Sequence, residues 1–268
     1  MPDVSAGPRL FVRRLLVVAP IALGLGLWLA VAWVVRGRGA PFPGPAETLV
    51  YLLEALRGRE LLGHSIYAHV GASVGRWAVG FLGGFLGAIV VAVLAGASRV
   101  LERILMPLVY VLQLVPGLAW VPVAILLFGL SNQATVFMIV VTALGPIAVN
   151  MVAGIRSAKE EHLRVARMAG AGTGEILLHV LLPGSVPHLM SGLRVGLGNC
   201  WRVVVAAEMV VGSGMGLGYS IIQSRWTLDY ASAFVCIILI CLVGLVVEYV
   251  GFTRLEAATV KRWGMVRS

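Results

Sequence analysis

The chain has 268 residues, of which 59% are hydrophobic and only 12% are charged. An ordinary soluble domain carries about 25% charged residues, and folding still leaves roughly a quarter of its unfolded surface exposed to water. This composition excludes a soluble enzyme and indicates a protein embedded in a lipid membrane. The three cysteines all lie inside apolar runs, which excludes a disulfide framework and favours small buried side chains.

The apolar runs are long enough to cross a membrane. A hydrocarbon core about 30 Å thick needs about 20 apolar residues of helix. One uncharged stretch, 104–155, is too long for a single helix, and its polar residues 129–133 divide it into two spans. The six expected membrane spans are therefore 15–35, 77–98, two within 104–155, 189–211 and 230–247.

The distribution of basic residues predicts the orientation of these spans. Most Lys and Arg residues fall in segments on the same side as the two termini, and basic residues concentrate on the cytoplasmic side of bacterial inner membranes. We therefore expect both termini in the cytoplasm. The net charge of +9 is then explained by the membrane topology, and no nucleic-acid partner is needed to account for it. The expected segments are a cytoplasmic N-terminus (1–14), a transmembrane domain (15–252) with an extracytoplasmic linker and surface helix (36–75) and a cytoplasmic loop (156–188), and a cytoplasmic tail (253–268).

The first apolar run has an alternative interpretation. Ala30 to Ala32 form a small-x-small site of the kind that ends a secretory signal. The run continues to Val35 and is longer than a typical signal core, so we expect an uncleaved membrane anchor.

Two further patterns describe the outer half of the chain. The segment 47–64 carries apolar residues at helical spacing and predicts an amphipathic helix at the outer membrane surface. In the second span, Gly80 and Gly84 overlap with Gly83 and Gly87 as two Gly-x-x-x-Gly spacings. Small residues at this spacing predict close packing against another helix.

The sequence pattern of the internal loop 156–188 predicts two short helices. Residues 158–169 favour a helix that ends near Gly170, and a second short helix at 174–182 is expected to stop at Pro183. A polar helix pair that projects from a membrane bundle offers a docking surface for a soluble partner.

This loop carries a resemblance to a known family. Arg164, Val165, Ala166, Gly170, Val180, Leu182 and Pro183 have the spacing of the Glu-Ala-Ala-x3-Gly-x9-Ile-x-Leu-Pro signature. With that spacing the chain resembles permease subunits of binding-protein-dependent ABC importers, although Arg164 stands where the family usually has Glu and Val165 where it usually has Ala. Between about residues 40 and 264, further similarity to the nitrate/sulfonate/taurine/bicarbonate branch lies at Ser73, Arg76, Gly80, Pro107, Val115 to Ala119, Phe128, Gly129, Gly192 to Arg194, Trp201, Ala207, Glu208 and Gly216 to Tyr219.

The resemblance implies an all-α, six-span fold of the type I ABC importer (MetI-like) kind. It also implies a second permease copy, two cytoplasmic ATPase subunits that bind ATP and magnesium, and an extracytoplasmic solute-binding protein that sets specificity. This chain would then hold no cofactor, metal or catalytic residue, and would work by alternating access. The residues that would couple it to the ATPase are Glu161, Leu163, Arg164, Val165, Ala166, Arg167, Met168, Ala169, Gly170 and Ala171. One chain holds a complete set of spans, so we expect a homodimer, and a heterodimer of two permeases is the alternative.

Polar residues inside the spans are the candidates for the solute pathway, because ionisable groups are costly in lipid unless they pair or face a cavity. The candidates are Arg76, Gln113, Pro116, Asn150, Asn199, Arg202 and Glu208. Arg202 suits an anionic solute, and its alternative role is a fixed salt bridge between helices. Glu208 lies about 120° from Arg202 around a helix, so we expect it to bond the glycine-rich turn instead. For the amides and the proline, helix packing is the alternative.

The glycine-rich turn after the fifth span lacks the spacing of a nucleotide-binding loop. Its residues Gly214, Gly216 and Gly218 are expected to form a flexible outer gate. Competing functions are an ion-gradient-driven secondary transporter, an intramembrane protease and a structural scaffold. The first would show inverted repeats and a deep acidic residue, and the first four expected spans contain no acidic residue. Nitrate, taurine, alkanesulfonate, bicarbonate and neutral heterocycles all stay open as the solute.

Overall fold

A computed structural model describes residues 6–212 and 214–256, so residues 1–5 and most of the predicted tail 253–268 lie outside the described residues. Within this part of the chain every element is helical, apart from one isolated bridge between Leu61 and His64. The elements are α1 (Ala6–Gly37), α2 (Pro45–Leu56), α3 (Ile66–Ala97), α4 (Arg99–Leu114), a 3-10 helix (Gly117–Trp120), α5 (Val121–Phe128), α6 (Asn132–Arg156), α7 (Glu160–Met168), α8 (Thr173–Ile176), a π-helix (Leu177–Leu181), α9 (Leu182–Gly184), α10 (Val186–Val211), α11 (Leu217–Thr227), α12 (Tyr230–Leu245), a second π-helix (Val246–Phe252) and α13 (Thr253–Glu256). The predicted all-α fold is confirmed.

Several helices are long and apolar enough to cross a membrane. Four do so as single helices, namely Val18–Gly37, Ile66–Ala97, Asn132–Arg156 and Tyr230–Tyr249. Two bent pairs also qualify: Arg99–Leu114 with Gly117–Phe128, bent by 100°, and Thr173–Gly184 with Val186–Val211, bent by 59°. The described residues therefore give six spans when each bent pair counts as one.

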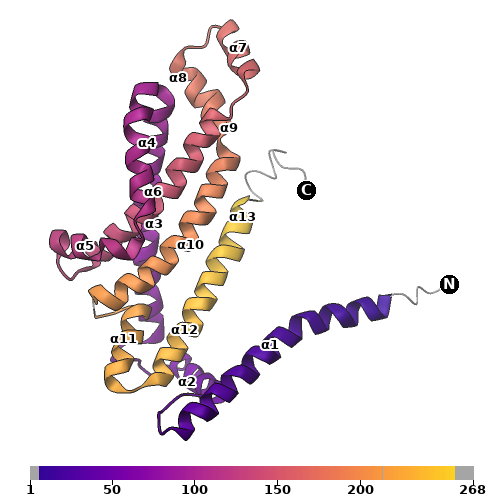
Figure 1. Ribbon diagram of the computed structural model, residues 1–268, viewed down its shortest axis with the longest axis vertical. Coiled ribbons are helices and arrows are strands. Elements are labelled where there is room, and N and C mark those ends of the chain that lie inside the picture. The colour runs from indigo at the N-terminus through magenta and orange to yellow at the C-terminus, as the bar shows by residue number, and fades with distance from the viewer. Residues whose placement is uncertain (1–5, 213, 257–268) are drawn as a thin grey trace.

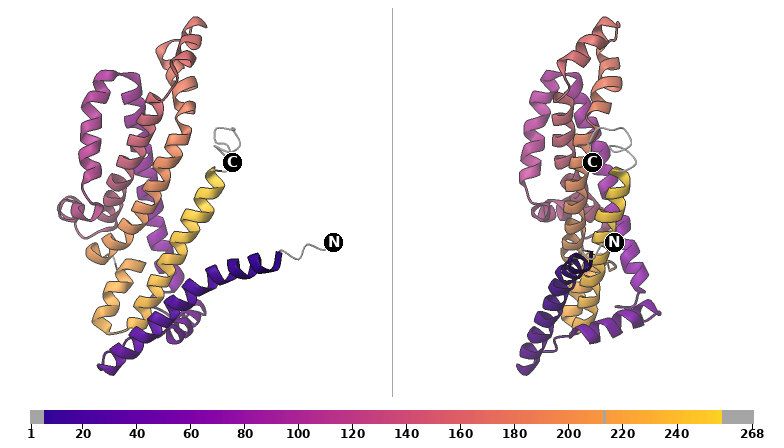
Figure 2. Two further views of the ribbon diagram at one scale, coloured as in Figure 1. Left: turned by 45° about the vertical axis from the view of Figure 1, so that its right-hand side comes forward. Right: turned by 90° about the vertical axis from the view of Figure 1, so that its right-hand side faces the viewer.

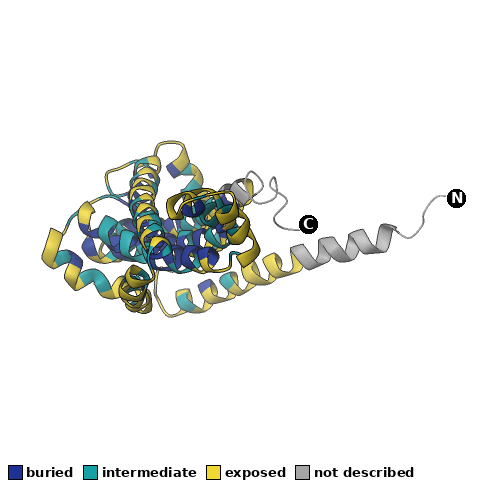
Figure 3. Cartoon of the chain, turned by 90° about the horizontal axis from the view of Figure 1, so that it is seen from above, coloured by how far each residue is buried: buried dark blue, intermediate teal, exposed yellow. Residues whose placement is uncertain are grey.

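The bundle is built around α3, α6 and α10, which run side by side in Figures 1 and 2. Viewed from above, buried residues gather inside this bundle, whereas α1 reaches away from it with a largely exposed surface (Figure 3). The helices α7 and α8 project at one end, and α2 and α11 lie at the opposite end. The loop between α6 and α10 is thus separated from the glycine-rich turn by the length of the bundle.

Glycines allow the three central helices to approach closely. A Cβ atom on Gly80 would lie 2.6 Å from Cβ of Ile139, and one on Gly84 would lie 2.5 Å from Cβ of Ala143. On α10, a Cβ atom on Gly192 would lie 2.9 Å from the carbonyl oxygen of Pro146. The predicted use of the Gly-x-x-x-Gly spacing in helix packing is confirmed.

The second span begins earlier than the sequence pattern indicated. The helix α3 starts at Ile66, where the predicted span starts at Trp77, and Ser65 caps it by accepting a hydrogen bond from the backbone N–H of Ala68. At 32 residues the helix is about 48 Å long, more than the roughly 30 Å of a membrane core. Hydropathy located the apolar part of the helix and missed its polar first turns. The outer surface helix, by contrast, is shorter than the predicted 47–64, since α2 ends at Leu56.

The third span is broken, because α4 ends at Leu114 and the chain turns by 100° into the next helices. Pro116 has no N–H to continue the hydrogen-bond ladder, and it disfavours helical geometry at Val115, whose backbone is extended (φ −77°, ψ 119°). The proline that interrupts the expected span therefore sets its geometry.

The loop 156–188 folds partly as predicted. The helix α7 ends at Met168, and Gly170 adopts a left-handed φ of +84°, so the predicted helix end is confirmed. The expectation that Pro183 stops the second helix is wrong, since the chain continues through it into α9. The N–H of Leu182 donates to the carbonyl of Leu177, five residues earlier, so the helix widens before the proline.

A Gly84→Val variant tests the α3–α6 contact. The added side chain meets Ala143 and the carbonyl of Val140, so we expect a loss of about 1–3 kcal/mol in the free energy of unfolding. Gly75→Val on the same helix is the matched control, because a Cβ atom there meets nothing within 4 Å. Unfolding in detergent micelles measures both, and equal stability of the two variants would contradict the packing described here.

Candidate functional site

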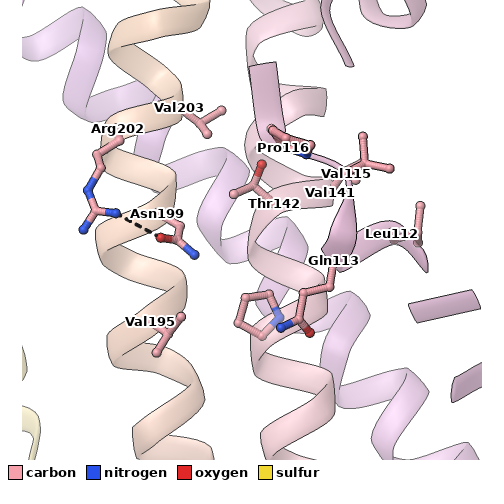
Figure 4. A pocket seen from close by; sticks show the side chains of 12 residues that line it. Leu112, Gln113, Val115, Pro116, Val141, Thr142, Val195, Asn199, Arg202 and Val203 are labelled. Carbon is pink, nitrogen blue, oxygen red and sulfur yellow. Dashed lines mark hydrogen bonds between the residues drawn. The ribbon is translucent and has the colours of Figure 1, made fainter. Parts of the chain in front are cut away.

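A pocket of about 390 Å³ lies where the end of α4, the middle of α6 and the middle of α10 meet. Four of the seven pathway candidates line it: Gln113, Pro116, Asn199 and Arg202. Figure 4 shows Asn199 and Arg202 on α10, Thr142 on α6, and Gln113 and Pro116 at the broken end of α4. Residues from distant parts of the sequence therefore share one cavity at the helix break.

The bend fits closely between the two long helices. A Cβ atom on Gly117 would lie 2.5 Å from Val203 and 2.6 Å from Oγ1 of Thr142. On α6, a Cβ atom on Gly145 would lie 3.0 Å from Cβ of Gln113. These two glycines let the broken span lie against α6 and α10 at the pocket.

Arg202 is the charged group of the pocket. Its Nη1 donates to Oδ1 of Asn199 at 3.2 Å, and its side chain is exposed. The pocket lining contains no Asp or Glu, and no ion pair to Arg202 occurs among the described side chains. The fixed salt bridge considered for Arg202 is therefore not found in the described part of the chain, and its positive charge borders the cavity.

The other three pathway candidates lie elsewhere. Asn150 donates from Nδ2 to the carbonyl of Pro146 at 2.8 Å, next to the point where Gly192 meets α6. Arg76 and Glu208 form a buried ion pair away from the pocket lining, with Nη1 and Oε1 2.5 Å apart. A pathway role for these three residues stays a prediction.

The Arg76–Glu208 pair is the centre of a buried polar cluster. Besides Glu208, Arg76 donates to Oδ1 of Asn132 at 2.7 Å and to the carbonyl of Met215 at 2.6 Å. The second carboxylate oxygen of Glu208 accepts from Oγ of Ser73 and from the N–H of Gly218, both at 2.9 Å. The expectation that Glu208 bonds the glycine-rich turn is confirmed. Because every carboxylate oxygen has a donor, the buried charge is compensated.

The same cluster holds the glycine-rich turn in place. The N–H of Gly216 donates to Nδ1 of His69 at 3.2 Å, and the N–H of Leu217 donates to Oγ of Ser73 at 2.9 Å. Gly216 has a φ of +143°, and a Cβ atom there would lie 2.6 Å from the carboxylate of Glu208. The turn is thus anchored at these residues, although a flexible loop was expected, and its role as a gate stays a prediction. Of its neighbours, Ser213 lies outside the described residues.

Sequence reasoning missed His69, Ser73 and Asn132 as partners of this cluster. The spacing of Ser73 and Arg76 offered a signal, since residues three apart share a helix face. No such signal in the sequence indicated the pairing of Arg76 with Glu208, because 132 residues separate them along the chain.

The predicted coupling residues form an exposed helix at the projecting end of the bundle. Val165 and Met168 on α7 are 66% and 88% exposed, which is unusual for apolar side chains. Arg164, at the position where the signature has Glu, pairs within the helix with Glu160 at 3.1 Å. The helix therefore presents an apolar strip without a partner among the described residues, and the coupling role of the ten residues stays a prediction.

An Arg76→Met variant tests the buried pair. It leaves the Glu208 carboxylate buried without its cation, so we expect a loss of about 3–5 kcal/mol in the free energy of unfolding, and a smaller loss in the double variant Arg76→Met/Glu208→Gln. Arg202→Met, which removes an exposed arginine, is the control. Denaturant unfolding in micelles measures all three, and wild-type stability of Arg76→Met would refute the structural role given to the pair.

Comparison with known proteins supports one family. Residues 84–257 match the model of the binding-protein-dependent transport system inner membrane component. Nitrate import permease protein NrtB of Leptolyngbya laminosa is 31% identical over 85% of this chain and 82% of its own length. Bicarbonate transport system permease protein CmpB of Synechococcus elongatus is 31% identical over 87% and 86%, and taurine transport system permease protein TauC of Escherichia coli is 28% identical over 76% and 74%. The chain belongs to the family of inner membrane components of binding-protein-dependent transport systems, in the nitrate, taurine and bicarbonate branch that its sequence resembles.

Proposed function

We propose that this chain is the permease subunit of an ATP-driven importer that moves a small solute with an anionic group, of the nitrate, sulfonate, taurine or bicarbonate type, across the bacterial cytoplasmic membrane. The observation that carries the proposal is the position of Arg202, a cation at a cavity whose lining holds no carboxylate. The names of the three relatives support the same solute class, since nitrate and bicarbonate are anions and taurine carries a sulfonate.

The pocket has the chemistry to receive an anion. Arg202 offers a planar set of N–H donors, and such forks match the oxygen geometry of nitrate, carboxylate and sulfonate groups. Gln113, Asn199 and Thr142 add uncharged polar groups to the lining, and the remaining wall is apolar. A hydrogen bond to a charged group contributes about 1.5–3 kcal/mol, enough to bias the pathway toward anions while the solute still leaves it.

The projecting loop has the form that energy coupling requires. The helices α8, the π-helix, α9 and α10 follow one another from Thr173 to Val211, with a bend of 59° between Gly184 and Val186. The short segment 169–172 joins α7 to this series, so a displacement of α7 would act on the helix that carries Asn199 and Arg202. Packed helix bundles have discrete alternative arrangements, so a displacement of this kind supports alternating access. The two ATPase subunits, the binding protein and a second copy of the chain complete the proposed assembly, with both termini in the cytoplasm.

An Arg202→Gln variant tests the anion pathway. Loss of the charge-assisted hydrogen bond is expected to raise the half-saturating solute concentration, or lower the uptake rate, by roughly tenfold to a hundredfold, and Arg202→Lys is expected to retain part of the activity. The measurement is uptake of labelled nitrate, bicarbonate or taurine by cells that express the complete transporter. Unchanged uptake by Arg202→Gln for every transported anion would remove Arg202 from the pathway.

A Val165→Asp/Met168→Asp variant tests the docking helix. Both side chains are exposed, so the substitutions leave the bundle intact, but they place charge in an apolar contact. We expect an ATPase subunit to co-purify with the wild-type chain in mild detergent and to be lost with this variant. Leu49→Asp, an exposed apolar residue on α2 at the other end of the bundle, is the matched control and is expected to retain the ATPase.

The same preparation separates the proposal from an ion-gradient-driven transporter. Proteoliposomes of the complete complex are expected to take up solute only with ATP. Uptake by the chain alone, driven by an ion gradient without ATP, would overturn the proposal.

A further inference from the structure

A second hollow lies between α4 and α6, at the end of the bundle that carries α7. It has a volume of about 570 Å³. The part near the start of α4, called the mouth here, is lined by Arg99, Arg103 and Arg156 with Glu102, and Pro107 and Tyr110 line the hollow farther along α4. It shares none of its lining residues with the pocket of Arg202.

Positive charge exceeds negative charge at this mouth. Glu102 is engaged by Arg156, whose Nε donates to Oε1 at 2.9 Å and whose Nη2 donates to Oε2. Arg156 also donates to the carbonyl of Ala95 at 3.3 Å, so it is held between α3 and α4. Arg99 and Arg103 are exposed and form no ion pair among the described side chains. Two positive charges therefore remain available at one opening.

Below the arginines the surface of α4 is apolar. The charged residues of α4 all lie in its first five positions, Arg99 to Arg103, and none follows before Leu114. Pro107 is exposed, and Tyr110 and Leu114 are 50% and 81% exposed. These three residues form a strip on the face of α4 that carries Arg103, since all four are spaced by three or four positions. Pro107 and Tyr110 also line the hollow, and Tyr110 lies about two turns from Arg103.

This arrangement, a charged end next to an apolar surface, matches the charged headgroup and apolar chains of a lipid. A cationic mouth with an apolar slope below it matches a phosphate headgroup with acyl chains, and basic pockets between membrane helices on the cytoplasmic side bind anionic lipid headgroups. Arginine side chains at helix ends reach the headgroup layer while their stems lie along apolar surface. A free anion would leave the strip of Pro107, Tyr110 and Leu114 uncovered.

We propose that the hollow between α4 and α6 binds one anionic phospholipid, with its phosphate at Arg99 and Arg103 and an acyl chain along the exposed strip of α4. The bound lipid would brace the first turns of α4, the helix whose other end supplies Gln113 and leads into the break at Pro116. The proposal does not depend on the identity of the transported solute.

The test uses the complete transporter, purified and delipidated in a neutral detergent. Phosphatidylglycerol and phosphatidylcholine with identical acyl chains are titrated in, and thermal unfolding together with native mass spectrometry reports binding. For the wild type we expect stabilisation and a retained lipid with phosphatidylglycerol and neither with phosphatidylcholine. Arg99→Gln/Arg103→Gln is expected to weaken phosphatidylglycerol binding at least tenfold. Arg38→Gln/Arg57→Gln removes the same charge at the opposite end and is expected to bind as the wild type does.

Other outcomes would overturn the proposal. Equal binding of the two lipids, or equal weakening by both double variants, would show that the arginines form no specific headgroup site. Full stabilisation by glycerol 3-phosphate, without acyl chains, would assign the hollow to a soluble anion. A shift from dimer to monomer in Arg99→Gln/Arg103→Gln, with phosphatidylglycerol binding unchanged, would assign this face to a second copy of the chain.

Discussion

The ion pair of Arg76 and Glu208 joins three parts of the chain that are far apart in sequence. Arg76 lies on α3, Glu208 lies on α10, and through Asn132 and Met215 the pair reaches the start of α6 and the glycine-rich turn. Removing either partner alone would leave a buried charge without its counter-ion. The ends of the central helices nearest the glycine-rich turn are therefore fixed relative to one another, and the beginning of α11 is fixed with them.

Close packing elsewhere makes the pocket of Arg202 stand out. Glycines bring α3 and α10 against α6 with little space between backbones. The break after Leu114, by contrast, turns the chain aside at a cavity between the end of α4 and the middle of α6 and α10. The close contacts depend on glycines within regular helices, and the cavity lies where a proline ends a helix. The cluster of Arg76 fixes one end of the bundle, the projecting helices occupy the other, and the cavity lies between them.

Much of this arrangement was accessible from the sequence. Apolar length predicted six spans, the number that the described residues reach when each bent pair counts as one. The Gly-x-x-x-Gly spacing predicted the close contact of α3, and the signature spacing located the projecting helix and its end at Gly170. The bend at Pro116 and the passage through Pro183 were not predictable from residue type, because a proline stops, kinks or follows a helix according to the hydrogen bonds around it. For the site, the sequence predicted Arg202 and Glu208 as separate candidates. It correctly indicated that they do not lie on the same face of their helix. It could not pair Glu208 with Arg76, since that contact depends on tertiary packing.

The π-helix Leu177–Leu181 holds one extra residue between the projecting helix α8 and the long helix α10. A π-turn accommodates one residue more than an α-turn, and each residue of a regular helix advances the chain by about 100° around its axis. Because the π-turn takes up the extra residue within one turn, deleting one residue from this segment would restore a regular ladder and leave the rotation of α8 relative to α10 nearly unchanged. Deleting one residue from the regular part of α10 would instead rotate the preceding helices by about 100° relative to the rest of α10. The π-helix is therefore the place in this series of helices where a change of one residue in length disturbs their relative orientation least.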